Sequence, residues 1–355
     1  MDIKKVLKQG VDMYATDLFI VSGLPLTFKK GGKQIRGTEK TLMPEDTIKY
    51  IKEIYAISDK SFDSFDKDKK DDDFSFSIPD VGRFRANVFM QRGSLATVVR
   101  IIQFGLPMAE DINIPEEVLA FADEKNGLVL LTGPAGTGKS TTLACIIDKI
   151  NKEKEKHIIT IEDPIEYIHS HNKSIVSQRE IGNDVDSYES AMRSVFRESA
   201  DVILLGELRD LNTMEVAMTA AETGQLIFST LHTIGAANSI DRVIDSFPAS
   251  QQGQIRLQLS MMLRGVISQQ LVPTIDGKII PVFEIMKTNV AIRNLIRDAK
   301  THQITSTMIA SNDMTTMDAN LVALKAQGII TEETALAYSQ NKEWTRKKLI
   351  GKKNV

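Results

Sequence analysis

The chain has 355 residues, enough for two compact domains and a small third part. Its hydrophobic fraction of 42% and charged fraction of 26% are those of ordinary globular proteins, which excludes disordered and fibrous classes. The net charge of −3 lacks the basic excess usual in proteins whose main partner is nucleic acid, so we expect no direct nucleic-acid partner.

The single cysteine, Cys145, excludes an internal disulfide and a four-cysteine zinc module. It falls within an apolar helical pattern, so we expect a buried, unreactive side chain. No stretch of about 18 apolar residues occurs, and the N-terminus lacks the apolar segment of a signal peptide. These features predict a cytoplasmic protein that does not span a membrane.

Residues 1–103 predict a mixed α/β domain. A short amphipathic helix opens it, and apolar residues then alternate with polar ones as in half-buried strands. The charged run at 59–73 is interpreted as a solvated loop or helix face. Residues 104–115 contain two prolines and predict an interdomain linker. The expected elements are strands at 17–21, 74–78, 83–89 and 95–102 and a second helix at 45–57.

Beyond the linker, apolar runs no longer alternate, and amphipathic helical patterns separate them. Continuous apolar strands between helices indicate a parallel sheet covered on both faces, as in an α/β nucleotide-binding core. From about Pro248 to the C-terminus the pattern predicts mostly helix. The expected core strands are 128–131, 158–161, 202–205 and 226–228, with helices at 187–197 and 213–222.

One segment fits the pattern G-x-x-x-x-G-K-[ST] throughout, between a buried strand and a helix expected to begin at Ser140. Glycines let the main chain turn its N–H groups toward phosphate oxygens, and the helix start adds a positive dipole end. Lys139 would contact the β- and γ-phosphates, and the Ser140 hydroxyl would bind Mg²⁺. The nucleotide-binding residues are thus expected to be Gly133, Pro134, Ala135, Gly136, Thr137, Gly138, Lys139, Ser140 and Thr141.

Acidic side chains follow two other apolar strands. Glu207 ends the strand 202–205 and is the expected metal-side carboxylate, with Asp210 a weaker candidate. Glu162, Asp163 and Glu166 crowd the end of the strand 158–161, where one of them could orient a water toward the γ-phosphate. His232, which follows the strand 226–228, could sense that phosphate.

These motifs resemble those of the retraction ATPases of type IV pili, within the secretion ATPase superfamily, over nearly the whole chain. The resemblance lies in five segments: the Walker A loop 133–142, an acidic box 160–166, a Walker B segment 206–210, a His box 223–233, and a C-terminal motif at 291–298. That last motif, characteristic of retraction motors, comprises Ala291, Ile292, Arg293, Asn294, Leu295, Ile296, Arg297 and Asp298.

The resemblance implies a PAS-like domain at 1–103, a RecA-like core at 116–287 and a helical region at 288–355. It also implies Glu166 as the catalytic glutamate, Glu207 as support for Mg²⁺, and His232 as the box histidine. The implied partners are five further copies in a ring of six and an inner-membrane pilus platform protein. Other pilus motor subunits are optional further partners. Arginines of the first domain would reach the phosphates of ATP, and the candidates are Arg83, Arg85 and Arg100.

Three positions depart from the family pattern. Gln225 replaces the first box histidine and cannot titrate, so any proton-linked role there is in doubt. Phe19 replaces an early histidine, and Asp298 replaces a final glutamate.

Four alternatives stay open. They are a pilus-assembly or type II secretion motor, which usually has a larger N-terminal region and a four-cysteine metal site; an accessory retraction paralogue; a DNA-stimulated RecA-like ATPase; and a non-catalytic nucleotide-sensing scaffold.

Overall fold

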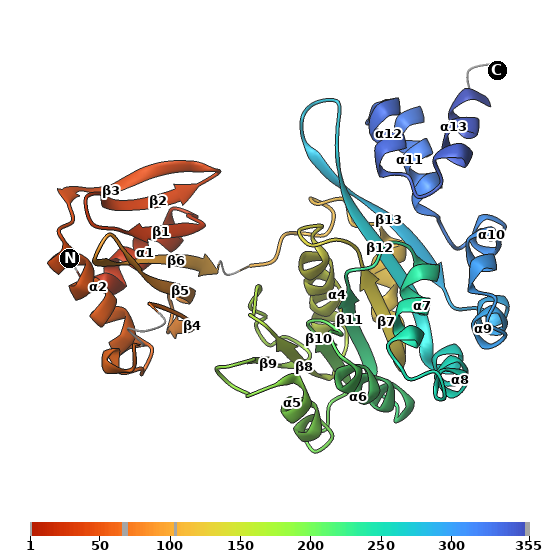
Figure 1. Cartoon of the computed structure of the whole chain (residues 1–355), viewed down its shortest axis with the longest axis horizontal. Helices are drawn as coiled ribbons and strands as arrows, with labels where there is room; N and C mark the ends of the chain where they lie inside the picture. Colours follow the sequence, from red (N-terminus) through yellow and green to blue (C-terminus); the bar gives the residue numbers. More distant parts are fainter. Residues whose placement is uncertain (1, 66–69, 103–104, 352–355) are drawn as a thin grey trace. The chain divides into compact units, whose positions relative to one another are not determined.

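The computed structural model describes residues 2–65, 70–102 and 105–351 (Figure 1). It divides into two compact units. The first extends to Gly105 and includes Glu166–Ile168; the second comprises Leu106–Ile165 and the chain from His169 onward. Residues 103 and 104, at the predicted domain boundary, lie outside the described residues. The predicted limits of the core and C-terminal region, at 287 and 288, both fall inside the second unit and stay a proposal.

The first unit is a six-stranded antiparallel sheet in the order β3-β2-β1-β6-β5-β4, with helices packed on one face. Inward-facing residues such as Phe84 and Val99 join the helices in one core, because strand side chains alternate between the two faces. The elements are α1 (Ile3–Asp12), β1 (Asp17–Ile20), β2 (Pro25–Lys30), β3 (Lys33–Thr41), α2 (Pro44–Ile57), the 3₁₀ turn η1 (Phe62–Ser64), β4 (Asp71–Ile78), β5 (Gly82–Gln91) and β6 (Ser94–Ile102).

The predicted α/β character of this unit is confirmed, but the hairpin of β2 and β3 was not anticipated. β3 is an edge strand whose residues are nearly all exposed or half-buried, so its sequence carries little apolar signal. Gly31 and Gly32, both with positive φ, form the tight turn between the two strands. The prediction of a loop or helix face at 59–73 is wrong for Asp71–Asp73, which pair with β5 in β4; residues 66–69 lie outside the described residues.

The second unit is built on a seven-stranded sheet in the order β13-β12-β7-β11-β10-β8-β9. All neighbouring strands pair in parallel except β12 and β13. The strands are β7 (Gly127–Thr132), β8 (His157–Glu162), β9 (Ile175–Glu180), β10 (Val202–Leu205), β11 (Leu226–Leu231), β12 (Leu263–Pro273) and β13 (Ile279–Lys287).

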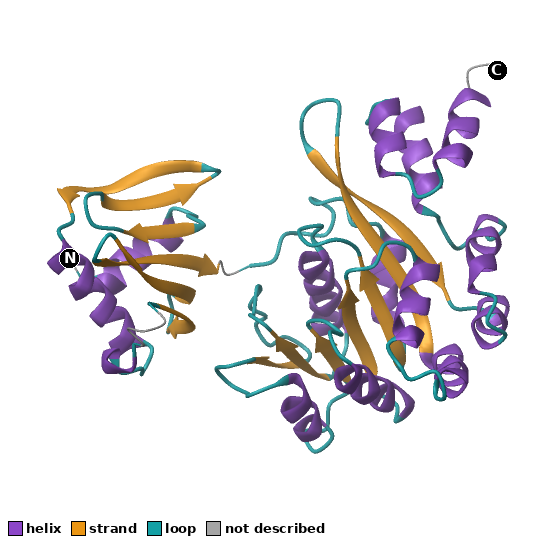
Figure 2. Cartoon of the chain, in the orientation of Figure 1, coloured by secondary structure: helices purple, strands orange, loops and turns teal. Residues whose placement is uncertain are grey.

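Helices cover both faces of this sheet, as the non-alternating apolar strands predicted (Figure 2). In β7, Leu128 and Leu130 face one layer, while Val129 and Leu131 face the other. The first layer contains α5 (Tyr188–Val195), α6 (Leu211–Glu222), α7 (Ala236–Asp245), α8 (Gln252–Met262), α9 (Val290–Arg297) and α10 (Ile304–Ile309). The second contains α3 (Glu116–Leu119), the 3₁₀ turn η2 (Ala120–Asp123) and α4 (Lys139–Glu153).

Cys145 lies in α4 and is buried, as expected, and burial raises the pKa of its thiol to about 11. At neutral pH the thiol therefore stays protonated, and a thiol reacts far more slowly than a thiolate.

The prediction that the chain is mostly helical from Pro248 onward is wrong for residues 263–273 and 279–287, which form the strands β12 and β13. Their centres carry polar side chains, which broke the apolar pattern. Ser268 and Gln269 are nonetheless buried, because each has a hydrogen-bond partner: Ser268 accepts from the Gly235 N–H, and Gln269 accepts from the Thr142 hydroxyl.

Three C-terminal helices, α11 (Met317–Ala326), α12 (Glu332–Tyr338) and α13 (Lys342–Gly351), pack together against the extended part of the β12–β13 hairpin; we call them the C-terminal bundle. Side chains cap the first two: Thr316 accepts from the Ala319 N–H and Thr331 from the Thr334 N–H. Within the described ranges 2–65, 70–102 and 105–351, every helix is too short or too polar to traverse a bilayer.

Candidate active site

The phosphate loop lies at the carboxyl end of β7, which pairs with β11 on one side and β12 on the other. Gly133, Gly136 and Gly138 all have positive φ, so the loop takes turns that residues with a Cβ avoid. A Cβ on Gly133 would lie 2.2 Å from the backbone oxygen of Gln269, so β12 packs directly against the loop. α4 begins at Lys139, one residue before the predicted start.

Lys139 folds back over this loop. Its Nζ donates hydrogen bonds to the carbonyl oxygens of Gly133 (2.8 Å) and Pro134 (2.9 Å), and the residue is only 8% exposed. The Thr137 hydroxyl also donates to the Pro134 carbonyl (2.9 Å). The loop thus holds a buried ammonium group beside its main-chain amides, which is the charge needed to bind the β- and γ-phosphates.

The other predicted strand-end residues meet at the same edge of the sheet. Parallel pairing places the end of β11 next to β7, that of β10 next to β11, and that of β8 next to β10. His232, Glu207 and Asp163 therefore follow one another along the edge, beginning beside the phosphate loop. This is the edge at which ligands bind in open parallel sheets.

Glu207 contacts two basic side chains, a histidine and an arginine. His232 Nε2 lies 3.1 Å from one carboxylate oxygen, and Arg209 Nε contacts the other. Burial and the positive charges of Lys139 and Arg209 lower the pKa of His232. At pH 7 we therefore treat the imidazole as neutral, with a proton on Nε2, and its contact with Glu207 as a hydrogen bond and not an ion pair.

Arg209 is a site residue that sequence reasoning missed. Besides Glu207, it contacts Asp163, with Nη1 3.5 Å from Oδ2, and so links the ends of β10 and β8. Its position in the Walker B segment was the only signal. Asp210, the weaker metal candidate, instead caps α6: its Oδ1 accepts from the Thr213 N–H (2.8 Å) and hydroxyl (3.0 Å).

Ser140 and Glu207 are the side chains at this edge that could hold a magnesium ion. Ser140 is exposed in the first turn of α4, where its hydroxyl is free of the packed core. Both Glu207 oxygens have protein partners, His232 on one and Arg209 on the other, and the carboxylate would supply negative charge to the ion. Mg²⁺ in nucleotide sites commonly keeps several waters and takes phosphate oxygens as ligands.

Glu166 is exposed and follows β8 after a cis Asp163–Pro164 peptide and the buried Ile165. It groups with the first unit, so the catalytic role expected for it stays a prediction. Glu162 serves the core instead: its Oε1 accepts from the Thr160 hydroxyl (2.7 Å) and from Gln178 Nε2 (3.3 Å).

The three candidate arginines share the helix-free face of the first unit's sheet. Arg85 pairs directly opposite Arg100, and Arg83 lies two residues before Arg85 on the same strand. Arg85 binds Asp73 through Nε (2.9 Å) and Nη2 (2.5 Å), and Arg100 Nε lies 3.3 Å from Asp17. Two of the three are therefore already bound to acids of their own unit, and their contact with phosphate stays a prediction.

The C-terminal motif forms the amphipathic helix α9, with Ile292 and Ile296 buried and Ala291, Arg293, Asn294 and Arg297 exposed. Leu295 is partly buried against the same core, and Asp298 ends the helix.

Gln225 lies at the opposite edge of the sheet from the phosphate loop. It directly precedes β11, its carbonyl accepts from the Gly127 N–H at the start of β7, and its side chain accepts from the Thr223 hydroxyl (2.8 Å). A strand of six residues spans about 20 Å. A proton-linked role for this position at the phosphates is therefore incompatible with its place in the fold.

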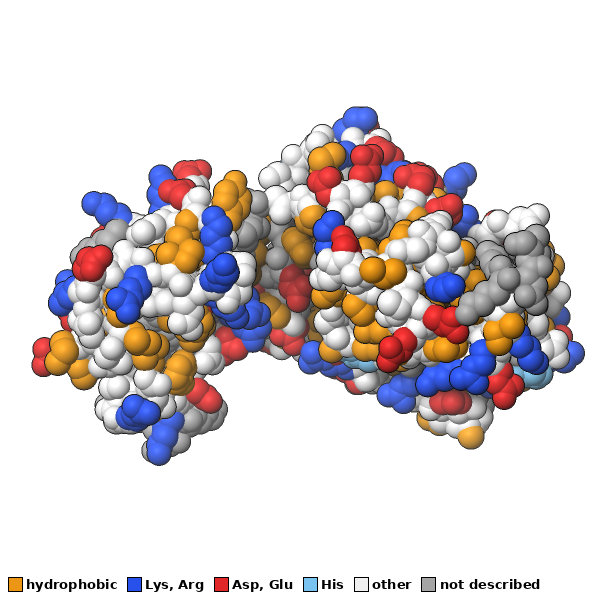
Figure 3. Space-filling model, turned by 90° about the horizontal axis from the view of Figure 1, so that it is seen from above, with side chains coloured by type: hydrophobic (Ala, Val, Ile, Leu, Met, Phe, Trp, Pro, Cys, Tyr) orange, Lys and Arg blue, Asp and Glu red, His pale blue; other side chains and the backbone are white. Residues whose placement is uncertain are grey.

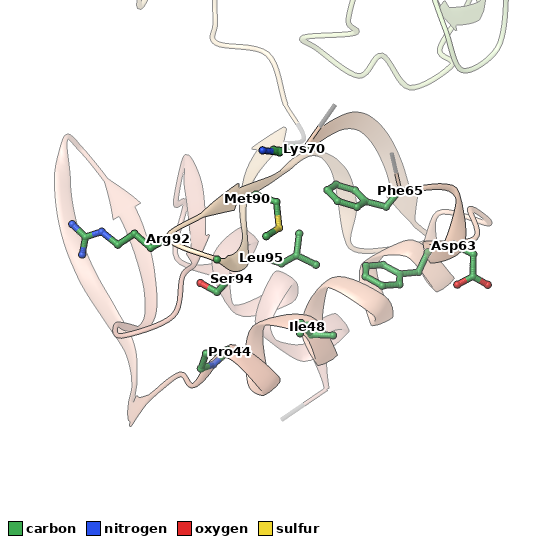
Figure 4. Close-up of a pocket in the computed structure, with 11 residues that line it drawn as sticks. Pro44, Ile48, Asp63, Phe65, Lys70, Met90, Arg92, Ser94 and Leu95 are labelled. Carbon is green, nitrogen blue, oxygen red and sulfur yellow. The ribbon is translucent and has the colours of Figure 1, made fainter. Parts of the chain in front are cut away.

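The first unit has a pocket of about 680 Å³. Its lining is mainly apolar, unlike the phosphate loop. Met90, Leu95, Phe65 and Ile48 border a common space (Figure 4). The lining residues are Pro44, Ile48, Phe62, Asp63, Phe65, Lys70, Met90, Arg92, Gly93, Ser94 and Leu95.

A phosphate loop after a central parallel strand, with a glutamate and a histidine on the adjacent strand ends, defines a RecA-like P-loop ATPase core. The chain belongs to the type II/IV secretion system protein family, whose model matches residues 101–350.

Two curated relatives match almost end to end. The type IV pilus retraction ATPase PilT of Pseudomonas aeruginosa is 42% identical over 94% of this chain and 97% of its own. The type IV pilus ATPase PilU of the same organism is 39% identical over 96% of this chain and 89% of its own. A crystal structure of the pilus retraction motor PilT with bound ADP superimposes with a TM-score of 0.88 and 43% identity, covering 98% of this chain and 99% of that one. The predicted fold class and family are confirmed.

Proposed function

We propose that this chain is the Mg²⁺-dependent ATPase that powers retraction of type IV pili. The observation that carries the proposal is the edge formed by the phosphate loop, His232 and Glu207. It supplies what phosphoryl transfer requires: amides and an ammonium group for the phosphates, and a carboxylate on the metal side. Similarity to a pilus retraction ATPase over 94% of the chain gives the site its biological setting.

In the proposed reaction, ATP binds to residues 133–141, and Lys139 exchanges its carbonyl partners for phosphate oxygens. Ser140 and Glu207 would hold Mg²⁺, which when bound would neutralise charge that develops on the β- and γ-phosphates. His232 orients the Glu207 carboxylate through Nε2–H. Glu166 orients the attacking water and accepts its proton. Arginines of the first unit, from the set Arg83, Arg85 and Arg100, bind phosphate when ATP is present and release it after hydrolysis.

Work follows from that release, because a nucleotide can shift a conformational equilibrium only through contacts that differ between the two states. We propose that six copies form a ring, act at the cytoplasmic face of the inner membrane, and bear on a platform protein of the pilus. The exposed residues of α9 are the proposed site of ring or platform contact. Native mass spectrometry with ATP should show six copies; a monomer at micromolar concentration would contradict the ring.

Glu166→Gln tests the catalytic assignment. The variant should bind ATP with wild-type affinity while turnover falls at least a hundredfold, because an amide orients water but cannot take its proton. Glu162→Gln is the matched control, since Glu162 lies four residues earlier and a glutamine oxygen can still accept from the Thr160 hydroxyl and Gln178 Nε2. Equal turnover in Glu166→Gln and wild type would falsify the assignment. A wild type that binds ATP without turnover would favour the nucleotide-sensing scaffold.

An accessory retraction ATPase is the second candidate, because the chain is nearly as similar to PilU as to PilT. Gene deletion separates the two. Loss of twitching with surface pili retained supports a principal retraction motor, retained twitching supports an accessory subunit, and loss of pili supports an assembly motor.

A DNA-stimulated ATPase would need a basic groove with interleaved aromatic side chains. On the face of the second unit seen in Figure 3, Lys and Arg side chains are mixed with acidic and apolar ones. Adding single-stranded DNA should therefore leave turnover unchanged, and a many-fold rise would replace the pilus proposal.

A further inference from the structure

A buried carboxylate in β13 joins the C-terminal bundle to the segment that carries His232. Glu284 lies in the middle of β13 and is 4% exposed. Its Oε1 accepts from the Ala236 N–H (2.7 Å), the first residue of α7. Its Oε2 accepts from the Met317 N–H (3.2 Å), the first residue of α11, and from Gln340 Nε2 (3.2 Å). One side chain therefore ties together the first residues of α7 and α11 and Gln340, which lies two residues before α13.

A buried carboxylate is costly unless such partners satisfy it. Burial, with the nearby charge of Asp318, raises the pKa of Glu284, while the N–H donors act in the opposite direction. An apolar residue would fill the same space in β13 without this cost. The neighbouring residues Ile285 and Met286 are buried apolar side chains of the hydrophobic core. The glutamate between such residues is explained by the three donors that it binds.

The segment 232–235 is held at both of its ends. At the first end, His232 contacts Glu207. At the second, the Gly235 N–H donates to Ser268 Oγ (3.0 Å), and the next N–H, that of Ala236, donates to Glu284. Four residues span at most about 14 Å, so a displacement at one end has little slack to absorb it.

Gln340 reaches the same segment directly. Gly235 has φ +86°, and a Cβ there would lie 2.6 Å from Gln340 Oε1, so the carboxamide packs on the Gly235 backbone. Asp318 in α11 accepts from the Gln340 N–H (2.7 Å) and the Asn341 N–H (2.8 Å), which fixes the start of α13 to α11. The bundle thus contacts the His232 segment through Gln340, whose backbone is tied to α11.

We infer that Glu284 and Gln340 are positioning residues, through which the C-terminal bundle sets the place of His232 beside Glu207 and thereby the rate of ATP hydrolysis. A binding partner or a neighbouring copy that displaces the bundle would therefore change the nucleotide site through this connection. The effect on rate rests on the proposed ATPase function; the mechanical connection does not.

Gln340→Ala is the main test, because Gln340 is exposed and its loss leaves the buried Glu284 with two of its three donors. Gln327→Ala is the matched control: Gln327 is also exposed in the bundle, at the end of α11. The first readout is the NMR signal of the His232 ring in protein with ¹³C-labelled histidines, assigned by its loss in His232→Ala. It should shift in Gln340→Ala and stay in place in Gln327→Ala.

The second readout is steady-state kinetics. Gln340→Ala should lower kcat about three- to tenfold with the KM for ATP within twofold of wild type, and Glu284→Gln, if it folds, should lower kcat further. An unmoved His232 signal in Gln340→Ala, or equal shifts in both variants, overturns the inference. A shifted signal with unchanged kcat overturns its rate-setting part. If wild type hydrolyses no ATP, the proposed function fails, while the NMR result still decides the connection.

Discussion

The hydrogen bond between Thr142 and Gln269 joins the phosphate-loop helix to β12. The Thr142 hydroxyl donates to Gln269 Oε1 at 2.8 Å, and the two residues are 1% and 2% exposed. Thr142→Val keeps the shape of the side chain but leaves the buried Gln269 oxygen without this donor. Such an unsatisfied group costs about 1–3 kcal/mol.

For a unit of this size, each kcal/mol shifts Tm by about 2–4 °C. Thr142→Val should therefore lower Tm by roughly 2–12 °C. Because β12 also packs on Gly133, part of the loss should appear as weaker ADP binding. If all of it did, Kd would rise about five- to 150-fold, which sets the upper limit.

Thermal unfolding followed by circular dichroism and calorimetric titration with ADP measure the two effects. The double variant Thr142→Val/Gln269→Met is the control, because removing both polar partners together is far less costly than removing one. It should recover most of the lost stability. A Thr142→Val protein as stable as wild type would refute the coupling. So would additive losses, in which the free energy of unfolding of the double variant falls by the sum of the losses in Thr142→Val and Gln269→Met.

Three further predictions concern single groups. Lys139→Ala removes charge-assisted bonds worth about 1.5–3 kcal/mol each, so calorimetry should show ATP binding at least tenfold weaker, with Lys152→Ala, a surface lysine of the same helix, unchanged. Because the pKa of His232 is lowered in the folded protein, the unfolded chain binds more protons as the pH decreases below about 6.5. The free energy of unfolding of wild type should therefore decrease as the pH is lowered through this range, and it should decrease less steeply in His232→Gln. Identical slopes would contradict the lowered pKa. With its pKa raised to about 11, Cys145 should resist alkylation at pH 8 until the protein unfolds, and mass spectrometry showing rapid labelling of the native protein would argue against its burial.

The phosphate loop and the central strands could be predicted because their signals are local. A glycine pattern fixes a turn, and four apolar residues in β10 mark a strand buried on both faces. His232 and Glu207 could then be placed together, since parallel strands end at one edge.

What could not be predicted depends on contacts between distant residues. Gln269 looks like a surface residue until α4 supplies the Thr142 hydroxyl, 127 positions away in the chain. Glu284 likewise looks misplaced in a strand until three separate segments donate to it. Arg209 had no signal beyond its place in the Walker B segment, because its two acidic partners follow different strands.

The outermost strand of the first unit, β3, has consequences for how copies of this chain meet. It exposes nine residues of backbone along an open sheet edge, and such an edge can pair with its counterpart on another molecule. Three cations, Lys33, Arg36 and Lys40, against the single anion Glu39 make two such edges repel each other. Edge-to-edge pairing of two copies through β3 is thereby discouraged.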